Sequence, residues 1–478
     1  MDLGVFYIDP AVISTFLDTH STTEIIFILV SFFAWIFLSQ VLIEGGLFLL
    51  AEYKQKQHIA NWKYVVLAID IPLLNVQTPK AVEQLFAHLA GAHEHVNIAE
   101  KFRHGHKQRS FSFEIISVGG YIQFLVWVEE ELRDLVEAAL YAQYPDAEVT
   151  EVEDYVDTVP SKFPNETHDM WGADFELAEN QAYPIRTYEE FEHSISKDTV
   201  LKDPMGTFLE SFTRIGKNEQ MWVQIIVEPV DSHWKEESIE KVNELIGTEA
   251  HHGGDHIVDK FIAFLMKFIE VFGDNIFGRE PSEAVHEEHD GPPNQLSYLT
   301  PGQKTVVEAM EKKMNKLGFK TKIRGIYVAP KADFHPNKGV AALVGAMNQY
   351  NIPTANSIVP KFGSSAHYIN ASKNTGKRKT KIMEAYKKRK LKLQESKPYI
   401  LNIEELATIW HFPMSHVKTP LVQKSIGKQA EPPIGLPLGL GDLPGAEEGG
   451  VDTKKTNGEK KFHTDSGGGD YPSGMKFG

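Results

Sequence analysis

The longest apolar segment of the chain lies near its N-terminus. From Ile25 to Ile43 there is no charged residue, and only two serines and Gln40 interrupt the apolar run. At about 1.5 Å per residue, a helix of this length covers roughly 28 Å, which is close to the thickness of a bilayer's hydrocarbon core. No other stretch of the sequence is comparable. The pattern therefore predicts a transmembrane helix over residues 24–50.

The charges around this segment predict its orientation. Acidic residues precede it, whereas the first basic residues of the chain, Lys54, Lys56 and Lys63, follow it. Because basic residues gather on the cytoplasmic side of membrane helices, we expect residues 1–23 outside the cytoplasm and the bulk of the chain inside it. A cleaved signal peptide would begin with a basic region, so an uncleaved, single-pass anchor in the inner (cytoplasmic) membrane is favoured.

After the anchor, strand-like and helix-like patterns alternate. A first group over residues 62–156 has the order βαββαβ, which is that of a ferredoxin-like split unit. Its elements are a strand at 64–71, a helix from Thr78-Pro79, a hairpin around Gly119-Gly120, a helix at about 130–144 and a strand at 147–152.

A second, less regular α+β group is predicted over residues 171–355, with an insertion at 247–298. Its helices begin at Asp203-Pro204 and Thr300-Pro301, where an N-cap residue precedes a proline. We therefore expect an α+β fold in which an N-terminal transmembrane helix is followed by two ferredoxin-like (βαββαβ-type) units. Residues 438–478 are rich in glycine and poor in β-branched residues, and they are expected to form a disordered tail.

The insertion contains an amphipathic helical pattern with an aromatic face. This face is typical of a helix that lies in a membrane interface or docks on a partner, and packing on the chain's own sheet is the alternative. The interfacial candidates are Phe261, Phe264, Phe268 and Phe272.

The formal charge of −16 is unevenly distributed. Residues 301–400 hold 21 basic and 5 acidic residues, and the remainder of the chain is strongly acidic. Within this part, residues 373–392 are dense in lysine and arginine, which favours contact with nucleic acid phosphates; anionic lipid, an acidic partner or a plain solvated surface are the alternatives. The candidates are Lys373, Lys377, Arg378, Lys379, Lys381, Lys387, Lys388, Arg389, Lys390 and Lys392.

Sequence motifs for catalysis are absent. The chain has no cysteine, which excludes disulfides, thiolate metal sites and a cysteine nucleophile. Gly376-Lys377 is the nearest approach to a P-loop, but Arg378 stands where Ser or Thr is needed. Two histidine-rich loops, at 93–106 and 251–256, permit a zinc site in principle, although exposed loop histidines are the commoner outcome. We expect no enzyme activity, catalytic residue, cofactor or metal.

Two stretches resemble a known family. They are FEIISVGGYIQFLVWVEEELRDLVEAALYAQYPDAEVTEVEDY and YILNIEELATIWHFPMSHVKTPLVQ. Both are similar to the cytoplasmic front end of membrane-anchored type IV secretion or conjugative DNA-transfer proteins, which are known mainly from uncultured, reduced-genome bacteria and contain a domain of unknown function. In these relatives the second motif leads into a P-loop ATPase. Here a glycine-rich segment follows Pro437 instead.

The resemblance implies a non-catalytic assembly or docking component of a DNA-transfer complex. It would be an oligomer that works with a P-loop ATPase supplied in trans, with DNA as a candidate ligand of the basic segment. Residues 360–437 would then combine the basic segment with a docking motif whose candidates are Glu405, Trp410, His411, Phe412 and Pro413. Packing of this motif on its own domain, and a protein scaffold that never contacts nucleic acid, are the alternatives.

Overall fold

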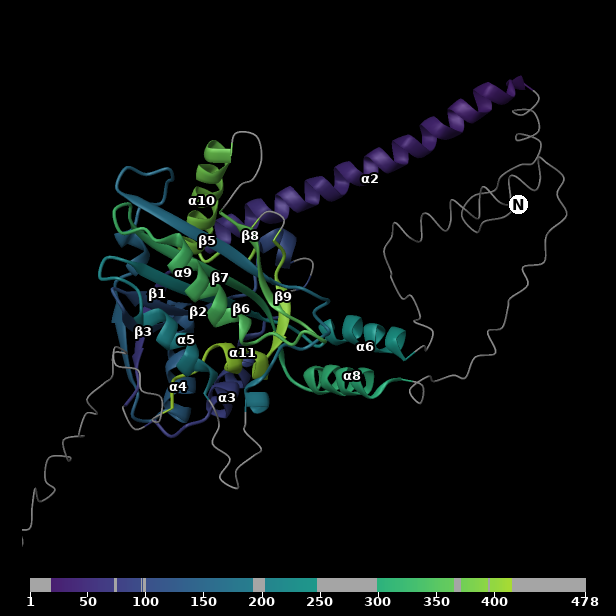
Figure 1. The fold of residues 1–478 in the computed structure, drawn as a ribbon. Helices are drawn as coiled ribbons and strands as arrows, with labels where there is room; N and C mark the ends of the chain where they lie inside the picture. The colour runs from purple at the N-terminus through teal and green to yellow at the C-terminus, as the bar shows by residue number, and fades with distance from the viewer. Residues whose placement is uncertain are drawn as a thin grey trace, which may run out of the picture. The chain divides into compact units, whose positions relative to one another are not determined.

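The computed structural model describes residues 19–72, 75–95, 97, 100–191, 203–246, 299–364, 371–393 and 396–414. The expected interfacial helix, with Phe261, Phe264, Phe268 and Phe272, and the expected glycine-rich tail lie outside these residues. Within them, helices and strands form a mixed fold built on one antiparallel sheet of nine strands (Figure 1).

The strands follow one path across the sheet, in the order β4-β1-β3-β2-β6-β7-β5-β8, and β9 pairs with the first residues of β7, before the part that pairs with β5. Neighbouring strands are antiparallel throughout. The bounds are β1 Tyr64–Asp70, β2 Phe111–Val118, β3 Tyr121–Glu129, β4 Glu148–Val152, β5 His168–Leu177, β6 Gln220–Pro229, β7 Gly318–Pro330, β8 Ile358–Gly363 and β9 Tyr399–Asn402.

Helices cover both faces of the sheet. One face, here called the first face, packs its apolar side chains against five helices, and Figure 1 shows α5, α9 and α11 lying over the strands. These helices are α3 Pro79–Leu89, α4 Arg133–Gln143, α5 Pro204–Thr213, α9 Pro336–Asn348 and α11 Ile403–Ile409. A separate pair, α6 Trp234–Leu245 and α8 Pro301–Met314, has its own small core around Val242 and Met310.

The opposite, second face is covered by α10 Ala371–Lys387 and by the segment around η4 Tyr155–Thr158. Alternation along each strand separates the two cores: in β6, Trp222 joins the second-face core, whereas Val223 and Ile225 join the first. The sheet is therefore the middle of three layers.

The hairpin predicted at Gly119-Gly120 is confirmed. Val118 pairs with Tyr121, and the two glycines between them have φ angles of 58° and 90°. Side chains with a Cβ rarely adopt such angles, so the glycines permit the tight connection that brings two β-rich runs together. The helix starts at Asp203 and Thr300 are confirmed too, the second with a capping box, and Asn402 forms another before α11. Thr78 precedes α3 as expected, but its side chain makes no capping hydrogen bond.

The apolar N-terminal segment forms α2, Thr22–Ile59, which is long and apolar enough to cross a membrane. Its apolar side chains are exposed, among them Phe27, Trp35 and Phe48. Its last turns contact the π-helical turn η2 Glu100–His104. Gly105 follows η2 with a φ of 70°, and a Cβ there would lie 2.3 Å from the carbonyl carbon of Lys54. The glycine therefore permits the close approach of α2 to this loop.

The boundaries expected from the sequence require correction at the C-terminal side. The second α+β group is expected to end at residue 355, and residues 360–437 are expected to hold the basic segment and the docking motif. Instead, β8 extends that group to Gly363, α10 covers the second face, and β9 with α11 completes the sheet and the first face. The basic segment and the docking motif are integral parts of one fold, because both contain apolar residues that the sheet needs for burial.

Candidate functional site

The basic helix α10 sits on the second face through a narrow apolar stripe. Ile382, Met383 and Tyr386 are buried there, and the indole of Trp222 in β6 lies 5.4 Å from the ring of Tyr386. At 3.6 residues per turn, these positions point to one side of the helix. The stripe explains why a segment so rich in lysine is ordered against the sheet.

A row of polar side chains crosses the second face beneath the C-terminal end of α10. Glu114, Gln224, Arg324 and Asp174 occupy paired positions on β2, β6, β7 and β5, and all four are fully buried. We call these four residues the polar row. Gln224 donates to Glu114 at 2.9 Å and accepts from Arg324 at 3.2 Å.

Arg324 is the centre of the polar row. Its Nε donates to Asp174 at 2.6 Å, and two of its other N–H groups donate to the backbone carbonyls of Ala385 and Lys390, each at 3.1 Å. The last carbonyls of a helix have no partner inside the helix and have a partial negative charge. The guanidinium therefore fixes the position of the α10 C-terminus while the Asp174 carboxylate balances its charge.

Arg389 connects the end of α10 to the same row. It has a φ of 45°, and its neighbour Lys390 donates from its backbone N–H to Ala385, so the helix ends in a Schellman-type turn. Glycine is usual at this position, because an L side chain in the left-handed region costs about 1–2 kcal/mol. The side chain is only 5% exposed and donates twice to Glu114, at 3.1 and 3.2 Å, and to Asp154.

Electrostatics keep Arg389 charged. Burial by itself lowers the pKa of Arg389, but Glu114 and Asp154 outweigh burial and raise that pKa above its ordinary value. The same site contains Tyr155, whose hydroxyl donates to Glu114 at 2.8 Å and whose pKa is raised by burial and by that carboxylate. Tyr155 and Arg389 therefore keep their protons at neutral pH.

The structure divides the predicted phosphate-binding residues into three groups. Five lysines of the segment are exposed, Arg378, Lys379 and Lys387 are half-buried, and Arg389 is buried. The side chain of Lys373 lies outside the described residues. The exposed lysines are Lys377, Lys381, Lys388, Lys390 and Lys392.

Three of the predicted contacts need correction. Arg389 is enclosed by carboxylates and cannot meet a phosphate in this fold. Lys387 donates to the backbone carbonyl of Val159, and Lys379 forms an ion pair with Asp169. Their role is to hold α10 on the sheet, because each uses its charge on a partner within the domain.

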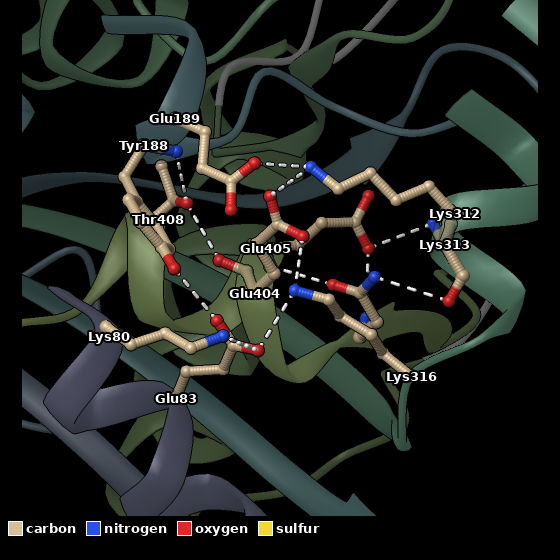
Figure 2. A network of polar contacts seen from close by, with 11 residues as sticks. Lys80, Glu83, Tyr188, Glu189, Lys312, Lys313, Lys316, Glu404, Glu405 and Thr408 are labelled. Atoms are coloured by element: carbon tan, nitrogen blue, oxygen red, sulfur yellow. Dashed lines mark hydrogen bonds and ion pairs between the residues drawn. The ribbon is translucent and has the colours of Figure 1, made fainter. Parts of the chain in front are cut away.

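The docking motif forms α11, and its two glutamates enter a second polar network (Figure 2). Glu405 pairs with Lys313 at 3.0 Å, and both side chains are almost completely buried. Burial lowers the pKa of Lys313 and the nearby Glu405 opposes that shift. Such a pair must stay together, because a buried charge without its partner is strongly destabilising.

Glu404 belongs to the same network but pairs with other lysines than Glu405 does. Figure 2 shows it between Lys312 and Lys316, at 3.3 and 2.6 Å. Lys316 reaches on to Glu83 of α3 at 2.9 Å, and Glu83 accepts from the hydroxyl of Tyr188 at 2.9 Å. Each carboxylate drawn in the figure faces a lysine, so the network joins α3, α8 and α11 by compensated charges and offers no unpaired carboxylate for acid–base chemistry.

The other docking candidates lie inside or against the first-face core. Trp410 and Phe412 pack against each other and against Phe124, with ring centroids 4.9 to 5.8 Å apart. His411 is fully buried: Nδ1 lies 2.8 Å from the Ala407 carbonyl and Nε2 lies 2.8 Å from Asp203. The Pro413 carbonyl accepts from Asn75 at 3.1 Å.

These placements agree with the packing alternative for the motif. Glu405, Trp410, His411 and Phe412 are all buried within the chain's own fold, so a partner could reach them only if α11 and the following residues left the sheet. The aromatic residues and the histidine are conspicuous in the sequence because they belong to a core at the point where α11 ends.

The histidine-rich loop at 93–106 does not assemble a metal site. The rings of His93 and His95 lie 4.9 Å apart, and His106 approaches Glu94 at 3.3 Å. Among the residues that the structure describes, no group of three or more potential ligands is placed to hold a metal ion. The second loop, with His251, His252 and His256, lies outside the described residues.

The polar row was missed in the sequence, although a signal for it existed. Glu114, Gln224, Arg324 and Asp174 each interrupt an otherwise apolar strand pattern, as in FSFEIISV and KIRGIYV. A single polar residue at an inward position is unusual because burial of an uncompensated charge is costly. Four such residues on four strands indicate that they compensate one another's buried charge or polarity. Which of them meet depends on how the strands pair, and the sequence does not give that pairing.

Comparison with known proteins adds one relationship. No match was found among curated proteins. The family model described as "Domain of unknown function (DUF8128)" matches residues 72–425, which include β2 to β9, both polar networks and the basic helix. Because this model covers well over half of the sequence, the chain belongs to the DUF8128 family.

Proposed function

We propose that the protein is a membrane-anchored, non-catalytic assembly or docking component of a type IV secretion-like or conjugative DNA-transfer complex, acting with a P-loop ATPase supplied in trans. Support comes from the resemblance of two sequence stretches to such proteins and from α2, which is apolar enough to serve as the anchor. Basic residues follow α2 and acidic residues precede it, in agreement with a cytoplasmic sheet domain.

We further infer that the sheet consists of two ferredoxin-like units joined edge to edge. β1-α3-β2-β3-α4-β4 and β5-α5-β6-β7-α9-β8 have the same order of elements. Numbered within its own unit, each set of four strands has the spatial order 4-1-3-2, and the two sets meet where β2 pairs with β6. The expected order βαββαβ then applies to both halves, with α6 and α8 inserted in the second.

The observation that supports a contact with nucleic acid is that the basic residues of α10 and of the turn after it form two groups, one held against the sheet and one exposed. Its buried stripe, Arg389, Lys387 and Lys379 fix the helix, whereas five lysines remain exposed along the same short segment. Lysines at this density can neutralise several phosphates and release their counterions, which gives binding that weakens steeply with salt.

The test uses the full chain in nanodiscs made of neutral lipid. We expect double-stranded DNA to bind with a salt dependence that is reduced by roughly one unit of slope for each phosphate-contacting lysine removed. The test variant changes Lys377, Lys381, Lys388, Lys390 and Lys392 to Gln. The charge-matched control changes Lys217, Lys235, Lys304, Lys331 and Lys338, which lie outside the basic segment, to Gln.

Equal binding by the two variants would contradict a DNA contact through α10. Undetectable binding by the unmodified chain would favour the protein-only scaffold. The proposed complex is tested separately, by purifying the tagged full chain from its native membranes: recovery of a P-loop ATPase supports the proposal, and its absence after mild cross-linking opposes it.

A further inference from the structure

A polar pair interrupts the apolar part of α2. Glu44 is the one charged residue between Glu24 and Glu52, and it lies roughly two helical turns before Glu52. The apolar stretch on either side spans about 40 Å of helix, which exceeds a hydrocarbon core of about 30 Å. In a membrane, Glu44 therefore lies within or close to the hydrocarbon region.

Within α2 this carboxylate has one hydrogen-bond partner among the described residues. Gln40, one turn earlier on the same face, donates from Nε2 to Glu44 Oε1 at 3.1 Å. The second carboxylate oxygen, the Gln40 carbonyl oxygen and its second N–H make no hydrogen bond to the residues that the structure describes. Ser39 differs, because its hydroxyl donates to the Trp35 carbonyl at 2.6 Å.

Unsatisfied polar groups are costly in lipid, and polar side chains inside membranes therefore pair with those of a neighbouring helix. Gln40 and Glu44 complement a copy of themselves. In two α2 helices inserted in the same direction, Gln40 lies level with Gln40 of the other copy, and Glu44 lies about one turn further along each helix. Because the two side chains already meet within one helix, the Gln40 amide of one copy is at nearly the depth of the Glu44 carboxylate of the other, and a twofold axis forms the reciprocal bond as well.

We propose that α2 associates in parallel with α2 of a second copy of this chain, through the face that contains Gln40 and Glu44. This proposal rests on the membrane anchor of the proposed function and names the surface by which the anchored chains pair. The pairing would bring two sheet domains together at the membrane.

The absence of cysteine makes a direct test available in the full chain. Leu47 lies one turn after Glu44 on the same face, whereas Leu42 lies on the opposite side because residues two apart are separated by about 200°. Under oxidation in native membranes, we expect Leu47→Cys to form a disulfide-linked dimer and Leu42→Cys to remain monomeric. Adding Glu44→Leu to Leu47→Cys should weaken dimerisation by about threefold to thirtyfold.

Two further variants separate hydrogen bonding from helix stability. Glu44→Gln keeps an oxygen acceptor, adds a donor and should retain the cross-link. Ser39→Ala removes a hydroxyl that is already bonded to its own helix and should leave cross-linking unchanged. Alkaline carbonate extraction on the same samples reports whether each chain is an integral membrane protein.

The outcomes distinguish this proposal from the one on which it rests. A chain that resists carbonate but cross-links equally at positions 42 and 47, or is unaffected by Glu44→Leu, keeps its anchor and overturns the pairing. A cross-link from position 47 to a different protein also overturns it. A chain that carbonate releases overturns both proposals.

Discussion

The two faces of the sheet are covered by different means. The first face buries a large apolar core under five helices, whereas the second face holds one basic helix over a smaller apolar core that is crossed by a row of charged and amide side chains. Apolar contact is non-directional and stabilises any arrangement that excludes water. A buried guanidinium, in contrast, requires particular partners at particular distances. The comparison suggests that the first face supplies stability and that the second specifies where α10 must lie.

The largest effect is expected on the first face. Trp410→Ala removes a fully buried indole that packs against Phe113, Phe124 and Phe412, and we expect a loss of about 4 kcal/mol in the free energy of unfolding. Urea unfolding of the full chain in detergent, followed by fluorescence or circular dichroism, measures it. Leu209→Met conserves the volume at another buried site and should cost less than about 1.5 kcal/mol. Equal losses from both variants would refute a close-packed core.

On the second face, Arg324→Met should cost about 3 kcal/mol, because buried Asp174 loses its guanidinium partner and the carbonyls of Ala385 and Lys390 each lose a donor. The additional change Asp174→Leu should recover part of this loss, since the buried carboxylate that has lost its guanidinium partner, and among the described residues keeps only Lys322 at 3.8 Å, is then removed. Denaturation of the two variants, with proteolysis at α10 as a local probe, tests the idea. If the double variant is less stable than the single one and α10 stays protected from the protease in both, the polar row does not fix the position of α10.

Arg389 separates backbone strain from ion pairing. Arg389→Ala loses the Glu114 and Asp154 contacts and keeps the left-handed backbone, so we expect a loss of about 2 to 3 kcal/mol. Arg389→Gly loses the same contacts but relieves the backbone, and it should be more stable than the alanine variant by about 1 kcal/mol. Unfolding midpoints in urea report the difference. Equal midpoints would mean that the turn is not strained.

A smaller effect depends on pH. Burial raises the pKa of Asp203, but His411 and the backbone N–H groups of Met414 and Met205 outweigh burial and leave the pKa below its ordinary value. A carboxylate with a lowered pKa stabilises the fold above the ordinary aspartate range, and this contribution is lost as the pH falls below about 4. Asp203→Asn should therefore flatten the acid part of the stability curve. If the stability of Asp203→Asn falls with acid as that of the unmodified chain does, other groups cause the loss of stability at low pH.

The smallest effect on stability is expected from the exposed side of α10. Lys381→Gln should change the free energy of unfolding by less than about 0.5 kcal/mol, because the lysine is exposed. If the helix contacts DNA, the same variant lowers affinity and the salt slope together. A variant that destabilises the fold by more than 1 kcal/mol would show that the distinction between the fixed and the exposed sides of α10 is wrong.

Much of the local structure was predictable. The Gly119-Gly120 hairpin and the helix starts at Asp203-Pro204 and Thr300-Pro301 depend on a few adjacent residues, and the structure confirms them. The role of the basic segment was not predictable in the same way. Arg389 and Lys381 are alike in sequence context, yet one is buried between carboxylates from distant strands and the other is exposed.

The sequence by itself determined the apolar helix α2, the alternation of strands and helices and the membership of a family, because periodicity and hydropathy are local properties of the chain. Only the tertiary structure decided that β2 pairs with β6, that α11 lies inside the core, and that Glu114, Gln224, Arg324 and Asp174 form one row. Strand register brings together residues as distant in sequence as Ala173 and Gly363, and the compensation of a buried charge depends on distance in space rather than on distance along the chain.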